Sequence, residues 1–208
     1  MKYVSIDIET TGLNPNTCEI LEIGAVVDTP TLRLEDLPTF RFRILRDMYI
    51  GELYALSMHG ELSKDLAIQP RNTIGYGTFG AYRTDIGPFE ARTWCGFEDE
   101  FPSQFADWLR QIGIDPTDFV VAGKNFANFD GPFLKKIIGT TVQWHHRILD
   151  PGSMYALPSD EKVPDTNECC RRAGINPADI PGNEHTSIHD ALVVIALIRK
   201  GFEQHEQT

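Results

Sequence analysis

The chain has 208 residues, of which 41% are hydrophobic, and its 19 basic and 30 acidic side chains give a formal net charge of −11. This length suits a single domain over residues 1–208 with a well-buried core. Because the net charge is acidic, we do not expect tight, non-specific binding of duplex nucleic acid. The four cysteines have no CxxC spacing, and charged residues interrupt the apolar N-terminal run, so we expect a cytoplasmic protein. No apolar run approaches the roughly 20 residues that span a bilayer, so we expect no membrane segment.

Three strands are predicted at the start of the chain. Val4–Ile8 and Ile20–Val27 are continuous apolar runs typical of buried strands, and a turn at Asn14–Asn16 separates them. Phe40–Ile44 alternates apolar and basic residues, which indicates a half-exposed strand. Short connections between successive strands favour an antiparallel meander.

The stretch from residue 46 to residue 96 has a weaker pattern. Glu52–Leu66 fits one or two short helices, and Thr73–Pro88 contains four glycines and fits a long loop or an irregular hairpin. We expect an irregular insertion at about 67–96. It is either an exposed connection or a functional segment whose aromatic residues stack on substrate bases.

Helices and strands alternate in the second half of the chain. Helices are predicted from apolar spacing and from stop signals such as Gly174, at Phe101–Ile112, Phe129–Ile138, Thr166–Ala173 and Ser187–Phe202. Short buried strands are predicted at Phe119–Gly123 and Arg147–Asp150. A meander followed by alternating helices and strands predicts an α/β domain of three layers.

The first strand carries the most informative pair of residues. Asp7 and Glu9 stand one residue apart, and residues i and i+2 of a strand point to the same face. Two like charges side by side oppose each other unless a positive charge lies between them. Hard carboxylate oxygens suit Mg²⁺ or Mn²⁺, although such a pair also occurs at solvated strand edges.

Two later segments place further candidate residues at helix starts. Asp130 opens one predicted helix; His185 precedes the last helix, and Asp190 lies in its first turn. Each has a structural alternative. Asp130 favours a helix N-terminus through the macrodipole, the spacing from Ser187 to Asp190 is that of a capping box, and His189 competes with His185 for any catalytic role.

Together these segments resemble the DEDD superfamily of 3′→5′ exonucleases, the DnaQ-like group of RNase H-like proteins. Asp7–Leu13 is similar to the first motif of that superfamily, Asn125–Leu134 to the second, and His185–Asp190 to the third in its histidine variant, DEDDh. Thr186 stands where the other variant has a tyrosine, which excludes that variant. The resemblance covers roughly residues 2–202 and implies an RNase H-like three-layer domain with a mixed central sheet flanked by helices.

The resemblance also implies a reaction and its residues. The reaction is two-metal hydrolysis of phosphodiester bonds at the 3′ end of single-stranded RNA or DNA, with release of 5′-mononucleotides. The implied ligands of two Mg²⁺ or Mn²⁺ ions are Asp7, Glu9, Asp130 and Asp190, and the implied general base is His185. The residues implied to hold the terminal nucleotide are Thr10, Thr11, Gly12, Leu13 and Asn125.

Two other functions remain open on the sequence. Ala55–Gly60 is similar to the A-x-x-x-H-G stretch of polymerase-proofreading members, which favours an exonuclease that works with a polymerase. The chain can also be a catalytically inactive exonuclease-fold module that binds nucleic acid or a protein. The retained acidic residues and His185 argue against the inactive module. RNA or DNA preference, substrate length, oligomeric state and pathway are not determined by the sequence.

Overall fold

The computed structural model describes residues 1–60, 62, 64, 66, 82–85, 91–183 and 186–206, with the backbone alone for 82–85, 91–92 and 205–206. Most of the stretch predicted as an insertion, and His185, lie outside these described residues. Within them, no helix has both the length and the apolar character needed to cross a lipid bilayer.

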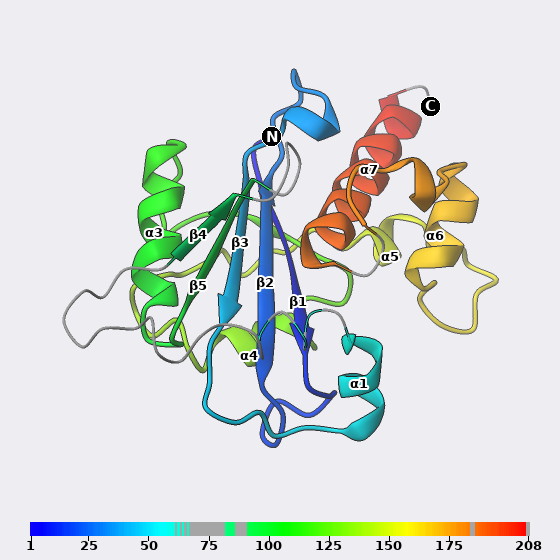
Figure 1. Cartoon of the computed structure of the whole chain (residues 1–208). Coiled ribbons are helices and arrows are strands. Elements are labelled where there is room, and N and C mark those ends of the chain that lie inside the picture. Colours follow the sequence, from blue (N-terminus) through cyan, green and yellow to red (C-terminus); the bar gives the residue numbers. More distant parts are fainter. Residues whose placement is uncertain are drawn as a thin grey trace.

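A mixed sheet of six strands forms the centre of the molecule, in the order β4-β5-β3-β2-β1-β6 (Figure 1). The strands are β1 (Val4–Thr10), β2 (Ile20–Val27), β3 (Thr39–Ile44), β4 (Tyr82–Asp85), β5 (Ala91–Gly96) and β6 (Val121–Ala122). β1, β2 and β3 pair antiparallel, which confirms the predicted meander, whereas β6 is parallel to β1 and β5 is parallel to β3.

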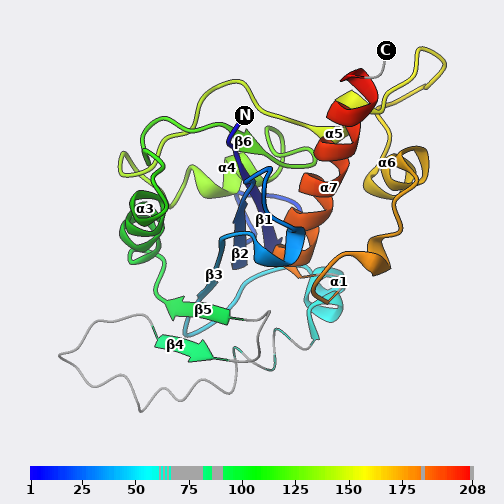
Figure 2. The same cartoon turned by 90° about the horizontal axis from the view of Figure 1, so that it is seen from above.

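Helices cover both faces of the sheet, which confirms the predicted α/β three-layer arrangement. The described helices are α1 (Leu53–Met58), α3 (Phe101–Gln111), α4 (Asp130–Leu134), α5 (Pro151–Met154), α6 (Thr166–Ala173) and α7 (Ser187–Glu206). Short 3₁₀ turns lie at Leu34–Asp36 and Pro177–Asp179. Seen from above, α3 and α4 lie on one side of the sheet, and α5, α6 and α7 lie on the other (Figure 2).

The alternation of side chains along β1 separates two hydrophobic cores. Val4, Ile6 and Ile8 pack into the core that α3 and α4 cover. The residues between them, Asp7 among them, point to the opposite face, which α7 covers. Because the period of a strand is two, one short segment supplies both an apolar face and an acidic face.

Four details of the predicted elements differ from the structure. Helix α4 ends at Leu134, and residues 135–138 continue as hydrogen-bonded turns. Residues 147–150 form a single bridge, Ala122 to Leu149, instead of a strand. Helix α5 was not predicted, although Pro151 at its first position and Asp150 as its N-cap are recognised start signals. Strands β4 and β5 lie in the stretch predicted to be irregular and pair as a hairpin with a shift in register.

Candidate metal centre

The candidate site lies at the C-terminal end of β1. In Figure 1 this end of the strand lies between α1, α4 and the first turn of α7. Contacts join all three helices to β1 and the turn that follows it: α4 and α7 pack against the strand, and the Glu52 N–H at the start of α1 donates to the Thr11 carbonyl at 2.7 Å. The three sequence motifs therefore meet at one corner of the sheet.

Three carboxylates from two distant elements converge there. Asp7, Glu9 and Asp190 each offer an oxygen, and these oxygens lie within 4.8 Å of one another. Asp7 and Glu9 share a face of β1, whereas Asp190 comes from the first turn of α7. Oxygen ligands at this spacing suit a hard divalent cation, so the donor set fits Mg²⁺ or Mn²⁺.

A glycine on the neighbouring strand lets α7 approach. A Cβ atom added to Gly24 would lie 2.5 Å from the carbonyl carbon of Ser187, closer than real Cβ contacts. Gly24 also lies opposite Asp7 in the ladder between β1 and β2. The absence of a side chain at Gly24 therefore brings the start of α7, and with it Asp190, against the acidic face of the sheet.

Asp130 stands beside this trio. It is the first residue of α4, is 2% exposed, and its Oδ1 accepts a hydrogen bond from the Ile8 N–H at 3.2 Å. That bond ties α4 to β1 midway between Asp7 and Glu9. The structure thus gives Asp130 a positional role besides the predicted metal-binding role, and its charge acts on Asp7.

Burial and mutual repulsion raise the pKa values of these carboxyls. Burial, followed by the charge of Asp130, raises the pKa of Asp7 well above its ordinary value. Burial, followed by the charge of Asp190, raises the pKa of Glu9 to about 8. Burial raises the pKa of Asp130 to about 7, against the opposing effect of two backbone N–H hydrogen bonds. Because this environment disfavours negative charge, a bound cation would stabilise these carboxylates more than it would stabilise exposed ones.

The residues after Glu9 form a turn that has one internal hydrogen bond and is tied by a second to the segment before α1. The Thr10 hydroxyl donates to the Gly12 carbonyl at 2.8 Å, and the Thr11 hydroxyl donates to the Ile50 carbonyl at 2.6 Å. Both threonine side chains are buried, whereas Leu13 is 74% exposed beside them. Of the predicted substrate-binding residues here, Leu13 has the side chain free to meet a ligand, and the two hydroxyls hold the turn.

Asn125 occupies a turn of its own. Its φ of 58° lies in the left-handed region, which asparagine tolerates better than most residues. Its side-chain oxygen accepts from Asn128 at 3.1 Å, and its N–H donates to Asp150 at 3.0 Å. The side chain is exposed, so the predicted contact with substrate remains a prediction.

The third motif is described except for His185. The Thr186 hydroxyl oxygen accepts from the His189 N–H at 3.4 Å in the manner of an N-cap, and Ser187 instead donates to Glu22 at 2.6 Å. Thr186 therefore takes the N-cap position, and the capping role of Asp190 stays an alternative. His189 is 2% exposed, with Nδ1 at 3.3 Å from the Pro181 carbonyl, which is the setting of a buried structural histidine.

The structure adds two residues to the site that sequence reasoning did not place there. His59, which caps α1, lies with Nδ1 at 3.4 Å from a Glu9 carboxylate oxygen. Glu22, in the middle of β2, lies directly opposite Glu9 and is 2% exposed. The signal for Glu22 was its place as the one charged residue in an otherwise apolar predicted strand, Ile20–Val27.

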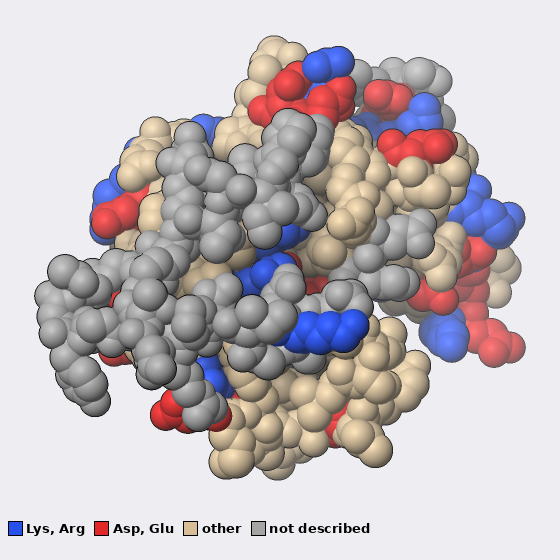
Figure 3. Space-filling model, viewed as in Figure 1, with Lys and Arg blue, Asp and Glu red and all other residues tan. Residues whose placement is uncertain are grey.

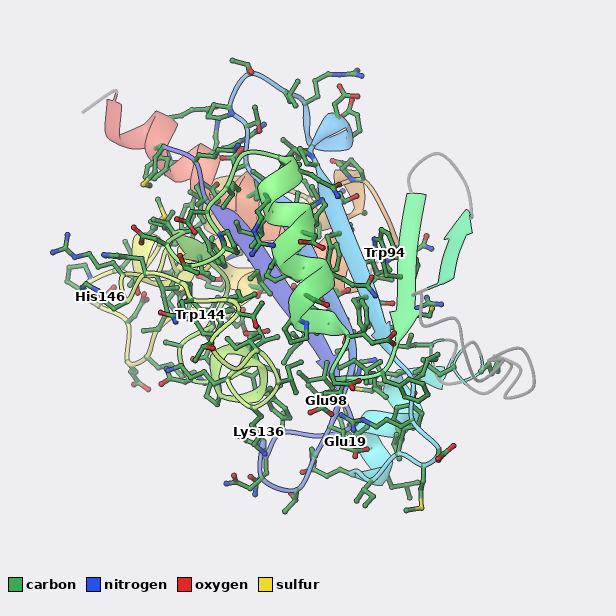
Figure 4. The ribbon with its side chains drawn as sticks, turned by 90° about the vertical axis from the view of Figure 1, so that its left-hand side faces the viewer. Glu19, Trp94, Glu98, Lys136, Trp144 and His146 are labelled. Carbon is green, nitrogen blue, oxygen red and sulfur yellow. The ribbon has the colours of Figure 1, made fainter. Side chains whose placement is uncertain are left out.

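Connections around the site are held by pairs of charged residues. Glu19 and Glu98 lie close together below the sheet in Figure 4, and Arg46 forms ion pairs with both. Lys136, labelled near the turn between β1 and β2, donates to the Pro15 carbonyl. The Lys136 contact ties the segment after α4 to the connection between β1 and β2.

The surface carries both signs of charge. On the described part of the face in Figure 3, Lys and Arg lie scattered among Asp and Glu and form no continuous basic field. On the described part of this face, the distribution agrees with the acidic total charge.

Comparison with known proteins shows the fold. No protein-family model and no curated protein matches the sequence. Among solved structures, the chain is similar to the zinc-bound complex of Escherichia coli ExoI with single-stranded DNA, with a TM-score of 0.58 and 16% sequence identity. The match covers 99% of this chain and 41% of that chain, so this chain spans less than half of the neighbour's length. At this identity the likeness establishes a shared α/β fold.

Proposed function

We propose that this protein is a metal-dependent 3′→5′ exonuclease of the DEDDh type that degrades single-stranded nucleic acid to 5′-mononucleotides. The observation that carries the proposal is the convergence of Asp7, Glu9 and Asp190 within 4.8 Å on a fold of exonuclease type. A carboxylate cluster that lacked a cation would oppose folding.

Each residue of the site has a proposed role in the reaction. Asp7, Glu9 and Asp190 would hold one cation, and Asp130 would help to hold a second. When bound, Mg²⁺ or Mn²⁺ ions lower the pKa of an attacking water and stabilise the leaving 3′ oxygen. His185, in its neutral form, accepts the proton of that water as the general base.

The turn after β1 and Asn125 bind the substrate end. The backbone of residues 10–13, held by the Thr10 and Thr11 hydrogen bonds, receives the terminal 3′ hydroxyl together with Glu9, and the exposed Leu13 packs against the last base. A site that requires a free 3′ hydroxyl acts only at chain ends. The preference for single strands rests on the acidic net charge and on the single-stranded DNA in the complex of the structural neighbour.

Matched RNA and DNA oligonucleotides with a 5′ or a 3′ label test the proposal. We expect a ladder of shortened 5′-labelled strands and immediate release of the 3′ label as a mononucleotide, with Mg²⁺ or Mn²⁺ present and not in EDTA. The Asp7→Asn variant is the matched control and should be inactive while folded. Internal cleavage, or full activity in EDTA, would contradict the proposal; binding of the strand without cleavage would identify an inactive module.

The same assay separates the proofreading alternative. A proofreading enzyme removes a mispaired 3′ end from a primer on a template and needs a polymerase surface to act efficiently. We expect this chain to degrade free single strands on its own. A dependence on added polymerase would favour the alternative.

A further inference from the structure

Glu22 is a buried carboxylate next to the metal centre that the proposed mechanism does not use. It lies directly across the ladder from Glu9 and on the same face of the sheet. Like charges directly opposite each other destabilise a sheet, and at 2% exposure water does not screen Glu22. Its presence therefore requires compensating contacts.

Those contacts come from a strand and a helix. The Arg43 Nε donates to one oxygen of Glu22 at 2.8 Å, and the Arg41 Nε lies 3.6 Å from the other. The second oxygen also accepts the Ser187 hydroxyl at 2.6 Å, in a fully buried hydrogen bond. The arginines of β3 balance the charge of Glu22, and the hydroxyl links it to α7.

The link acts on the first turn of α7. Ser187 is the first residue of that helix, and Asp190 follows three positions later, on the same side of the helix. Ser187 also rests on Gly24, two residues after Glu22 on the same face of β2. The hydrogen bond to Glu22 and the contact with Gly24 together fix where the turn meets the sheet.

We propose that Glu22 is a positioning residue of the metal centre, which holds Ser187, and so the first turn of α7, where Asp190 meets Asp7 and Glu9. Arg43 balances its charge, so Glu22 serves as an anchor without joining the metal-binding carboxylates. This inference rests on the metal site of the proposed function and not on the identity of the substrate.

The dissociation constant for Mn²⁺, measured by titration calorimetry well below the melting temperature, tests the proposal. Ser187→Ala should weaken Mn²⁺ binding by about three- to tenfold, the size expected for loss of one buried hydrogen bond. The matched control is Tyr155→Phe, which removes the buried hydrogen bond from the Tyr155 hydroxyl to the Leu197 carbonyl, at 2.9 Å, farther along α7. It should lower the melting temperature of the protein to a similar extent and leave the dissociation constant unchanged.

A double variant shows whether the two residues act together. Glu22→Met has a similar length and accepts no hydrogen bond, so adding Ser187→Ala to it should change the Mn²⁺ dissociation constant by less than about twofold. An unchanged constant in Ser187→Ala, an equal loss in Tyr155→Phe, or a full additional loss in the double variant would overturn the proposal. If Glu22→Met does not fold, the comparison of Ser187→Ala with Tyr155→Phe decides.

The outcome is independent of the nuclease assay. If the variants change the Mn²⁺ dissociation constant as expected but the protein degrades no oligonucleotide, the inference about Glu22 holds and the proposed activity is wrong. If the protein degrades oligonucleotides but Ser187→Ala binds Mn²⁺ as tightly as the wild type, the proposed activity holds and the inference about Glu22 is wrong.

Discussion

The Asp7 carboxyl is held among charges of its own sign. Burial and the charges of Asp130 and Glu9 raise its pKa well above the ordinary value. At neutral pH the metal-free site must either retain protons or keep repelling carboxylates in place, and both lower the free energy of unfolding relative to a site with a cation.

Asp7→Asn should therefore have opposite effects with and without metal. In EDTA at pH 8, close to the raised pKa of about 8 of its neighbour Glu9, the variant should melt at a higher temperature than the wild type because one repelling charge is gone. Saturating Mg²⁺ or Mn²⁺ should raise the wild-type melting temperature by about 5–10 °C at a hundredfold excess over Kd, and the variant much less.

Scanning calorimetry of both proteins in EDTA and in Mn²⁺ measures this. Asp107→Asn, which changes a 68% exposed aspartate on α3, is the control and should respond to metal as the wild type does. Equal metal-induced shifts in Asp7→Asn and the wild type would mean that the cations bind elsewhere.

Two histidines near the third motif should have separable roles. His185→Ala should lower the rate by about 10²- to 10⁴-fold, the usual scale for a lost general base, and leave the melting temperature near that of the wild type. His189→Ala removes a buried side chain packed beside Pro181 and should lower the melting temperature while costing much less activity. Rates at saturating metal and thermal melts of both variants are the measurements, and a greater rate loss in His189→Ala would exchange the two assignments.

At the scale of elements, α6 packs against α5 and α7 through its buried face, and one arginine adds a polar anchor. The Arg172 guanidinium donates to both carboxylate oxygens of Asp160, at 2.6 and 2.8 Å, and to the Tyr155 carbonyl at 2.7 Å. The helix also begins with an Asp165 cap and ends at Gly174 in the left-handed region, so its local signals and its anchor agree.

The ion pair between Arg172 and Asp160 should make part of the free energy of unfolding depend on pH. The hydrogen bond from Arg172 lowers the pKa of Asp160 to about 2 from its ordinary value near 4. A lowered folded-state pKa stabilises the protein above the unfolded-state value, and that contribution disappears as pH falls from about 4 to about 2. Asp160→Asn should lower the melting temperature at pH 7 and show a smaller further decrease in acid than the wild type does.

Melting curves from pH 7 down to pH 2 test this dependence. Asp107→Asn is again the matched control, because its partner Arg110 is 56% exposed and exposed pairs contribute little. An acid profile of Asp160→Asn parallel to that of the wild type would show that Arg172 does not stabilise the fold through Asp160.

At the scale of the whole molecule, the candidate metal centre joins segments that are far apart in the chain. β1 brings Asp7 and Glu9, α4 brings Asp130, and α7 brings Asp190, while α3 lies on the same side of the sheet as α4 and brings none of these residues (Figure 2). Opening any one of the three contributing segments destroys the site, so a bound cation should oppose each opening.

Hydrogen exchange followed by mass spectrometry should show this coupling. Saturating Mg²⁺ should slow exchange in peptides covering 7–13, 128–134 and 187–192, by up to about a hundredfold at a hundredfold excess over Kd. Peptides covering 101–111, in α3, which contributes no residue to the site, should change little. Uniform slowing across all peptides would indicate global stabilisation instead of local closure of the site.

Local patterns in the sequence were sufficient to predict several secondary-structure elements and the acidic character of the candidate site. Ile20–Val27, Thr166–Ala173 and the start of α7 at Ser187 were predicted at their observed bounds, because apolar period, caps and Gly174 are local signals. The side-by-side placement of Asp7 and Glu9 also followed from the strand period alone. Asp130 and Asp190 joined the proposed metal set through the resemblance of their segments to the second and third motifs of the DEDD superfamily.

Only the tertiary structure decided how these residues are placed against one another. The approach of α7 depends on Gly24, the Ile8 N–H bond fixes Asp130, and Glu22 joins β2 to Ser187 near the other end of the chain. Sequence patterns report which face a residue occupies within its own element. They do not report which distant group balances its charge or fills the space next to it, because those contacts form only when the layers pack.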